Sequence, residues 1–282
     1  MTFARPDSKD VEAVIDAALA EDIGAGDATT RTTVPAGTSL TLDLNARQDM
    51  VVCGLDIAMT VFRRLTPSVG IETYAKDGDR ASAGTRLARL VGSAQGLLSA
   101  ERTALNILQK LSGIASLTRQ YVDVIDGTGA VLLDTRKTIP GLRGLSKYAV
   151  RAGGGTNHRM RLDDGILIKD NHVAVCGGSV GEAVRRAKAG NTGLEIRAEC
   201  DTLDQVRDAL AAGADSLLLD NMPPDLLREA VAIVRGKIPL EASGGVRLDT
   251  IRAIAETGVN YISAGAITQS APAVDVGLDL AS

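Results

Sequence analysis

After about residue 130, short apolar runs alternate with amphipathic segments along the chain. The apolar runs span residues 131–135, 165–170, 194–200, 215–221, 238–245 and 261–266. The segments between them, such as 202–213 and 223–236, have helical spacing, and several begin with Thr, Pro or Asp and end on Gly, as helices do. This alternation predicts parallel β/α units. Because six strands stand where a closed barrel has eight, we expect an open, incomplete β/α barrel, with a doubly wound sheet as the alternative.

Every predicted strand ends on polar or glycine residues. These ends are Asp134-Thr135-Arg136-Lys137, Lys169-Asp170, Glu199, Asp220-Asn221, Ser243-Gly244-Gly245 and Gly265. In β/α barrels the active site lies at the carboxyl ends of the strands, where residues distant in sequence converge. One charged strand end can serve solubility alone, but charged or polar ends on strand after strand favour a functional site at one mouth of the barrel.

The predicted mouth combines two kinds of chemistry. Its first half carries the cations Arg136, Lys137, His158, Arg159 and Lys169. Its second half carries the carboxylates of Glu199 and Asp220, followed by glycine-bearing turns at Ser243-Gly244-Gly245 and Gly265. Such turns expose backbone N–H groups that bind a phosphate. Three roles are open to the carboxylates: holding Mg²⁺ together with substrate oxygens, hydrogen-bonding a sugar diol, or pairing with the cations opposite.

The N-terminal part has a different pattern. Residues 36–95 contain short alternating runs and Gly turns, which predict a small β-rich sandwich. Residues 76–92 are similar in shape to a biotinyl or lipoyl hammerhead, but Lys76 lacks the Met-Lys-Met hairpin of a carrier. A long amphipathic helix follows, with Ser99 as its expected N-cap and Arg102 in its first turn, where a cation is unfavourable to the helix dipole.

We expect two domains. Residues 1–115 form an N-terminal α/β sandwich and residues 116–269 form the open β/α barrel. The C-terminal tail, about residues 270–282, is expected to pack back on the first domain.

Charge is unevenly distributed in this chain of 282 residues, whose net charge is −4. Residues 134–172 contain eight Lys or Arg against four Asp, together with both histidines, so this window carries +4. A local reversal of this kind indicates a pocket for an anion. The simpler alternative is an amphipathic helix with solvated cations, which suits Arg143, Lys147 and Arg151 at i, i+4 and i+8.

Composition excludes several classes of protein. The acidic net charge gives no reason to expect nucleic acid or an anionic membrane as a partner. Three cysteines without a C-x-x-C pair suit a reducing compartment, and we expect no signal peptide and no membrane span. We therefore predict a cytoplasmic protein.

Several longer motifs resemble those of the quinolinate phosphoribosyltransferases. The motifs are "ERTALNILQKLSGIA", "DTRKTIPGLRGLSKYAVRAGGGTNHRM", "ILIKDNH", "LLLDN", "EASGGV" and "ETGVNYISAGAIT", and the resemblance runs in order from Val11 onward. It implies an N-terminal α/β sandwich, a C-terminal open β/α barrel and a homodimer. It also implies that each active site is completed by an Arg of the neighbouring subunit, equivalent to Arg102.

The resemblance assigns roles to the charged residues. Quinolinate is a planar pyridine with two adjacent carboxylates, and by similarity Arg136, Arg159 and Arg102 of the neighbouring subunit hold it. Lys137, His158 and Lys169 line the same pocket, with Arg47 as a further candidate. Glu199 and Asp220 bind Mg²⁺ and the ribose hydroxyls of phosphoribosyl pyrophosphate, and Ser243, Gly244, Gly245 and Gly265 bind its 5′-phosphate. The candidate catalytic residues are Lys137, Lys169, Glu199 and Asp220, whereas His172 either organises a loop or contacts pyrophosphate.

The implied reaction is the Mg²⁺-dependent formation of nicotinate mononucleotide, CO₂ and pyrophosphate from quinolinate and phosphoribosyl pyrophosphate, a step of NAD biosynthesis. A molybdenum-transport-associated relative of the ModD type shares the fold and is the nearest alternative. A Schiff-base aldolase or lyase using Lys169, or a non-enzymatic carrier or anion-binding protein, are the others. The chain departs from the family pattern at Arg197, where an acidic residue is expected, and at Arg161, often a glycine.

Overall fold

The computed structural model describes residue 3 and residues 5–281, and the chain divides into two compact units. The first unit comprises Met1–Arg119, Thr138–Gly154 and Ser270–Ser282, and the second comprises Gln120–Lys137 and Gly155–Gln269. Residues 138–154 thus belong to the first unit, whereas the sequence assigned them to the barrel. The C-terminal tail also belongs to the first unit.

A four-stranded antiparallel sheet forms the β-layer of the first unit, in the order β12-β1-β5-β3. The strands are β1 (Ser39–Ala46), β3 (Gly70–Thr73), β5 (Arg86–Ser93) and β12 (Val276–Leu280). A second small sheet pairs β2 (Met50–Val51) with β4 (Arg80–Ala81). Leu44 of β1 and Ala88 and Leu90 of β5 are completely buried and lie on one face, so the alternating pattern predicted for this region reflects a sheet with one face in the core.

The helices of this unit complete its core. They are α1 (Ser8–Ile23), α2 (Ala28–Thr33), α3 (Leu55–Leu65), α5 (Arg143–Ala152) and α4 (Ala94–Ile125), the last of which continues into the second unit. The N-cap predicted at Ser99 was wrong, because α4 begins directly after β5 ends at Ser93, with no intervening turn to cap. Ser99 Oγ instead donates a hydrogen bond to Asp27 Oδ2 at 2.9 Å, and Arg102 lies well inside the helix.

The expected solvent exposure of the cations on α5 was wrong for Lys147. Its side chain is completely buried, beside the buried apolar residues Leu145, Val150 and Ala149 of the same short helix. The i, i+4, i+8 spacing shows which positions share a face, but only the packing decides which face is covered.

The second unit contains six parallel strands, one within each apolar run of the sequence. They are β6 (Val131–Leu133), β7 (Ile166–Ile168), β8 (Ile196–Cys200), β9 (Ser216–Asp220), β10 (Leu240–Ser243) and β11 (Tyr261–Ser263). The sheet order is β6-β11-β10-β9-β8-β7, so the last strand returns beside the first, as in a barrel. A doubly wound sheet reverses its order in the middle, and this sheet does not. The order leaves β6 and β7 unpaired with each other, which is where the barrel is open; the isolated bridge between Leu133 and Thr156 lies on this side of β6.

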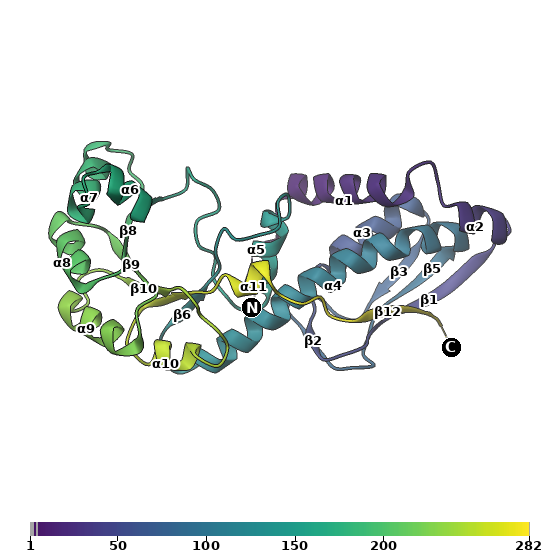
Figure 1. The fold of residues 1–282 in the computed structure, drawn as a ribbon. Coiled ribbons are helices and arrows are strands. Elements are labelled where there is room, and N and C mark those ends of the chain that lie inside the picture. The colour runs from purple at the N-terminus through teal and green to yellow at the C-terminus, as the bar shows by residue number, and fades with distance from the viewer. Residues whose placement is uncertain (1–2, 4, 282) are drawn as a thin grey trace. The chain divides into compact units, whose positions relative to one another are not determined.

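Helices α7 (Val180–Ala189), α8 (Leu203–Ala212) and α9 (Pro224–Val234) lie side by side along this sheet (Figure 1). Shorter helices follow β7, β10 and β11, namely α6 (Asp170–Val175), α10 (Ile251–Ala255) and α11 (Ala266–Gln269). Local signals set the helix starts: the Ser179 hydroxyl accepts from Glu182 N at 3.0 Å, and Pro opens α9. No helix in the described residues is long and apolar enough to cross a membrane.

Candidate active site

A pocket of about 410 Å³ lies in the second unit at the carboxyl ends of the strands. All six strands or the segments directly after them contribute to it, as expected for the mouth of a β/α barrel. Eight residues predicted from the sequence line it: Arg136, Lys137, His158, Arg159, Lys169, Glu199, Asp220 and Ser243. The remaining lining residues are Thr135, Leu167, Leu218, Glu241 and Ser263.

Two carboxylates, Glu199 and Asp220, occupy the β8 and β9 side of this pocket. Burial raises the pKa of Glu199 above its ordinary value despite the nearby Lys169, and the negative charges of Asp220, Asp170 and Asp201 add to the rise. Burial and the charge of Asp201 likewise raise the pKa of Asp220. Lys169 Nζ lies 3.6 Å from Glu199 Oε2. Carboxylates with raised pKa values in a pocket are poised to gain cationic or hydrogen-bond-donating ligands.

The cationic side of the pocket includes two guanidinium groups. Nε of Arg136 is buried and has no hydrogen-bond partner among the described residues. Arg159 Nη1 donates to the carbonyl of Gly165 at 2.8 Å, and burial together with the charges of Arg136 and Arg197 lowers the pKa of Arg159. Neighbouring cations that share a partly buried pocket repel one another, so an anion that enters between them is attracted.

Two glycines at strand ends are required for different reasons. Gly244 has φ +90°, and a Cβ there would collide with the side chain of Asn221. The backbone N–H of Asn221 donates to the Ser243 carbonyl at 2.8 Å. At Gly265 a Cβ would lie 3.0 Å from Cδ of Lys137. Gly244 therefore allows the turn after β10 to close against the β9 end, whereas Gly265 makes room for a pocket lysine.

Asp134, at the end of β6, was not singled out from the sequence, yet it holds the histidine segment in place. Its carboxylate is completely buried. Asp134 Oδ1 accepts from the backbone N–H of His158 at 2.9 Å, and Oδ2 accepts from Asn157 Nδ2 at 2.6 Å. Its position directly before Thr135-Arg136-Lys137, at a strand end, was the available signal.

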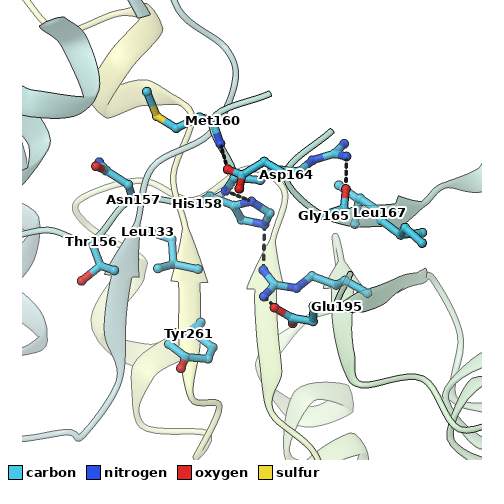
Figure 2. Close-up of a pocket in the computed structure, with 13 residues that line it drawn as sticks. Leu133, Thr156, Asn157, His158, Met160, Asp164, Gly165, Leu167, Glu195 and Tyr261 are labelled. Carbon is cyan, nitrogen blue, oxygen red and sulfur yellow. Dashed lines mark hydrogen bonds and ion pairs between the residues drawn. The ribbon is translucent and has the colours of Figure 1, made fainter. Parts of the chain in front are cut away.

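A second pocket, of about 420 Å³, lies behind the first, and His158, Arg159 and Leu167 line both. In Figure 2 the His158 ring points toward the guanidinium group beside Glu195. This guanidinium is that of Arg197, whose Nη1 lies 2.7 Å from His158 Nε2 and whose Nη2 is 2.9 Å from Glu195 Oε1. The opposite ring nitrogen, His158 Nδ1, accepts from the backbone N–H of Arg159 at 2.8 Å. Both ring nitrogens of His158 are therefore engaged by protein groups.

The remaining predicted residues lie outside the pocket lining. Arg47 and Arg102 belong to the first unit, where Arg47 Nη2 pairs with Asp279 Oδ1 at 2.6 Å and Arg102 is exposed on α4. His172 Nδ1 accepts from the backbone N–H of Lys169 at 3.0 Å, so it stabilises the first turn of α6. Within the described residues, His, Cys, Asp and Glu form no group of three or more able to hold a metal ion.

Comparison with known proteins identifies the family. The sequence model described as "Quinolinate phosphoribosyl transferase, N-terminal domain" matches residues 27–112, and the one described as "Quinolinate phosphoribosyl transferase, C-terminal domain" matches residues 114–279. The chain belongs to the quinolinate phosphoribosyl transferase family. The resemblance read from the sequence motifs is thereby confirmed.

Individual relatives cover nearly the whole chain. A probable carboxylating nicotinate-nucleotide pyrophosphorylase of Bacillus subtilis is 44% identical over 261 residues, covering 92% of this chain and 90% of that protein. The carboxylating nicotinate-nucleotide pyrophosphorylase of Mycobacterium leprae is 44% identical over 274 residues, covering 93% and 94%.

Solved structures of the quinolinate phosphoribosyl transferase family have the same fold. The nicotinate-nucleotide pyrophosphorylase of Francisella tularensis superposes with a TM-score of 0.92 at 39% identity, covering 98% of both chains. That of Ehrlichia chaffeensis also gives 0.92, at 42% identity, and covers 100% of both. The predicted fold class, an N-terminal α/β domain followed by a barrel-like domain with a parallel sheet, is confirmed, and this family is one of phosphoribosyltransferase enzymes.

Proposed function

We propose that this protein transfers the phosphoribosyl group of phosphoribosyl pyrophosphate to quinolinate with loss of CO₂, forming nicotinate mononucleotide and pyrophosphate in NAD biosynthesis. The observation that carries the proposal is the pocket at the strand ends, which brings the cations Arg136, Lys137, Arg159 and Lys169 together with Glu199, Asp220 and Ser243. Its cations suit an aromatic dicarboxylate, and its carboxylates suit a Mg²⁺-bound sugar phosphate. The relatives' names, carboxylating pyrophosphorylase and decarboxylating phosphoribosyltransferase, describe this reaction in opposite directions.

Quinolinate binding rests on the guanidinium groups. Removing a dianion from water is costly unless charged donors replace its hydration, and a hydrogen bond to a charged group contributes about 1.5–3 kcal/mol. Guanidinium forks match carboxylates with two parallel hydrogen bonds, so Arg136 and Arg159 are assigned to the two carboxylates of quinolinate. The buried Nε of Arg136 without a protein partner supports this assignment, since an unpaired buried donor is itself unfavourable. Lys137, His158 and Lys169 line the same cavity.

Phosphoribosyl pyrophosphate is assigned to the β8–β11 side. Glu199 and Asp220 would accept hydrogen bonds from the ribose hydroxyls and would hold a Mg²⁺ ion together with substrate oxygens, where the ion would neutralise phosphate charge. Two protein carboxylates suit Mg²⁺, which keeps several waters and takes its other oxygen ligands from phosphates. The Ser243-Gly244-Gly245 turn, with Gly265 on the neighbouring strand end, binds the 5′-phosphate through N–H groups.

The reaction then depends on positioning and electrostatics. As the C1–O bond to pyrophosphate breaks, C1 of the ribose gains positive charge. The pyridine nitrogen attacks this carbon and forms the new C1–N bond. Glu199 and Asp220 would stabilise that positive charge, whereas Lys137 and Lys169 would stabilise the negative charge of the departing pyrophosphate. The ring nitrogen becomes cationic and accepts the electron pair of the C2–carboxylate bond, so CO₂ leaves and C2 takes up a proton.

We further propose that the protein acts as a homodimer in the cytoplasm. Arg102 is exposed on α4 in the first unit, so it is available to a neighbouring subunit. In this arrangement Arg102 of one subunit completes the quinolinate site of the other.

The proposal is tested by incubating the purified protein with carboxyl-labelled quinolinate, phosphoribosyl pyrophosphate and Mg²⁺. Labelled CO₂ and nicotinate mononucleotide should appear only when all three are present. The Arg136→Ala variant should lower kcat/KM for quinolinate by about 100-fold or more, because it removes a bidentate charged contact. Arg228→Ala, on the exposed side of α9, serves as the control. A folded wild-type protein that releases no CO₂ would contradict the proposal and favour a ModD-type substrate.

A further inference from the structure

A buried carboxylate, Glu241, lies in the wall of the proposed quinolinate pocket. Its side chain is 1% exposed, and the residue lines the pocket together with Arg136 and Arg159. Burial by itself raises the pKa of Glu241, but contacts with His158 and Arg197 outweigh burial and lower it below the ordinary value. The group is therefore ionised at neutral pH. A negative charge in this wall repels a dianionic substrate unless the protein neutralises it.

The neutralising group is the guanidinium of Arg197. Arg197 Nη1 donates to Glu241 Oε2, and its Nε donates to Ser216 Oγ at 2.9 Å. The same Nη1 lies 2.7 Å from His158 Nε2, which is 3.4 Å from Glu241 Oε2. We call Arg197, Glu241 and His158 the Arg197 clamp. Its members come from β8, β10 and the segment after β6, so the clamp joins three parts of the barrel.

Strand periodicity explains where the clamp lies. Arg197 is two residues before Glu199 on β8, and Glu241 is two residues before Ser243 on β10. Residues two apart point to the same face of a strand. Arg197 and Glu241 thus belong to the interior layer directly beneath the layer of Glu199 and Ser243. Arg197 lines the second pocket and not the first, so it acts on the substrate site through Glu241 and His158.

We propose that Arg197 is a positioning residue for quinolinate, which neutralises Glu241 and fixes the carboxylate that faces the His158 ring, so that the pocket stays cationic. This inference rests on the proposed function and adds to it a residue outside the substrate contacts. In this chain the electrostatic balance of the pocket therefore depends on Arg197.

The test compares three variants with wild type. Arg197→Met leaves the Glu241 charge uncompensated, and the KM for quinolinate should rise at least about ten-fold, with a much smaller change in the KM for phosphoribosyl pyrophosphate. Arg197→Lys retains a positive charge and should recover part of the loss. The double variant Arg197→Met/Glu241→Gln removes the charge that needs neutralising and should recover most of it. Arg207→Met, an exposed arginine on α8 paired with Asp204, is the matched control.

Imidazole ¹⁵N NMR gives an independent readout, because the chain has only two histidines. Arg197→Met should shift the His158 nitrogen signals and leave those of His172 unchanged, with His172→Gln used to assign them. A role limited to packing would leave the double variant as impaired as the single one.

The outcomes separate this inference from the proposed function. Suppose that wild type makes nicotinate mononucleotide and that thermal unfolding shows Arg197→Met to be folded. If this variant then keeps the wild-type KM for quinolinate, the inference about Arg197 is wrong and the proposed function stands. The same conclusion follows if Glu241→Gln fails to rescue. If Arg197→Met does not fold, the KM for quinolinate of Arg197→Lys is compared with that of the double variant. Wild-type values in Arg197→Lys together with an impaired double variant would contradict the inference. If wild type neither binds nor converts quinolinate, both are wrong.

Discussion

At the scale of single residues, carboxylates of the same barrel mouth have opposite electrostatic environments. Glu241 is buried and paired, and its pKa is lowered. Asp220 is partly buried beside Asp201, and its pKa is raised. The first is neutralised through Oε2, although its Oε1 has no hydrogen-bond partner among the described residues, whereas the second is an unfavourable charge that a bound ligand can relieve.

Asp220→Asn should therefore separate stability from activity. Because the folded-state pKa of Asp220 is raised, its ionised form costs stability at neutral pH, and this cost disappears as pH falls through the raised value toward the unfolded value of about 3.9. The variant should melt at a higher temperature than wild type at pH 7, and the difference should shrink toward acid pH in a series of thermal unfolding curves. Turnover should fall by about 100-fold or more, since the proposed ligand of Mg²⁺ and ribose is lost. A lower melting temperature at pH 7 would contradict this account, and Asp225→Asn on the exposed side of α9 should change neither quantity.

At the scale of elements, the turn that follows each barrel strand determines which side chains and backbone groups line the pocket. The turn after β10 closes against Asn221, itself at φ +53°, so two adjacent strand ends are fitted to each other. The turn after β6 is held by Asp134, which ties residues 157 and 158 to the strand end. These contacts explain why short strands of three to five residues can present a fixed arrangement of charges.

Replacing Gly244 by Ala tests the turn after β10. A Cβ at this position meets the Asn221 side chain, and φ +90° is unfavourable for a residue with a side chain. We expect a loss of about 1–3 kcal/mol in the free energy of unfolding and a higher KM for phosphoribosyl pyrophosphate. Gly245→Ala is the paired control, because Gly245 also has a positive φ of +58° but has open space around it. Denaturant unfolding and steady-state kinetics should rank Gly244→Ala as the more harmful, and equal effects would show that the Asn221 contact is unimportant.

At the scale of the whole molecule, the proposed quinolinate site needs residues of both units. Arg136 and Arg159 belong to the second unit and Arg102 to the first. If Arg102 acts across a dimer, two variants that are each inactive can complement one another, which a site within one chain does not allow.

Mixing two inactive variants should restore activity. In a dimer of one Arg102→Ala subunit and one Arg136→Ala subunit, one of the two sites has both arginines intact. Random exchange of subunits should give about one quarter of wild-type activity, because half of the dimers are mixed and each has one working site. The measurement is CO₂ release after unfolding and refolding the variants together, with each variant refolded alone as the control. Activity no higher than the sum of the separate variants would place Arg102 outside a shared site.

The amino-acid sequence by itself determined the repeating units of the barrel and the polar residues at its mouth. Most strands and helices depend on neighbours a few residues away, so the apolar runs and strand-end residues such as Glu199 and Ser243 could be read directly. Only the tertiary structure decided which side chains face each other across the barrel. The Arg197 clamp joins residues 44 positions apart, and Asp134 holds residues 23 and 24 positions away. Such contacts depend on strand order and register, which no local pattern encodes.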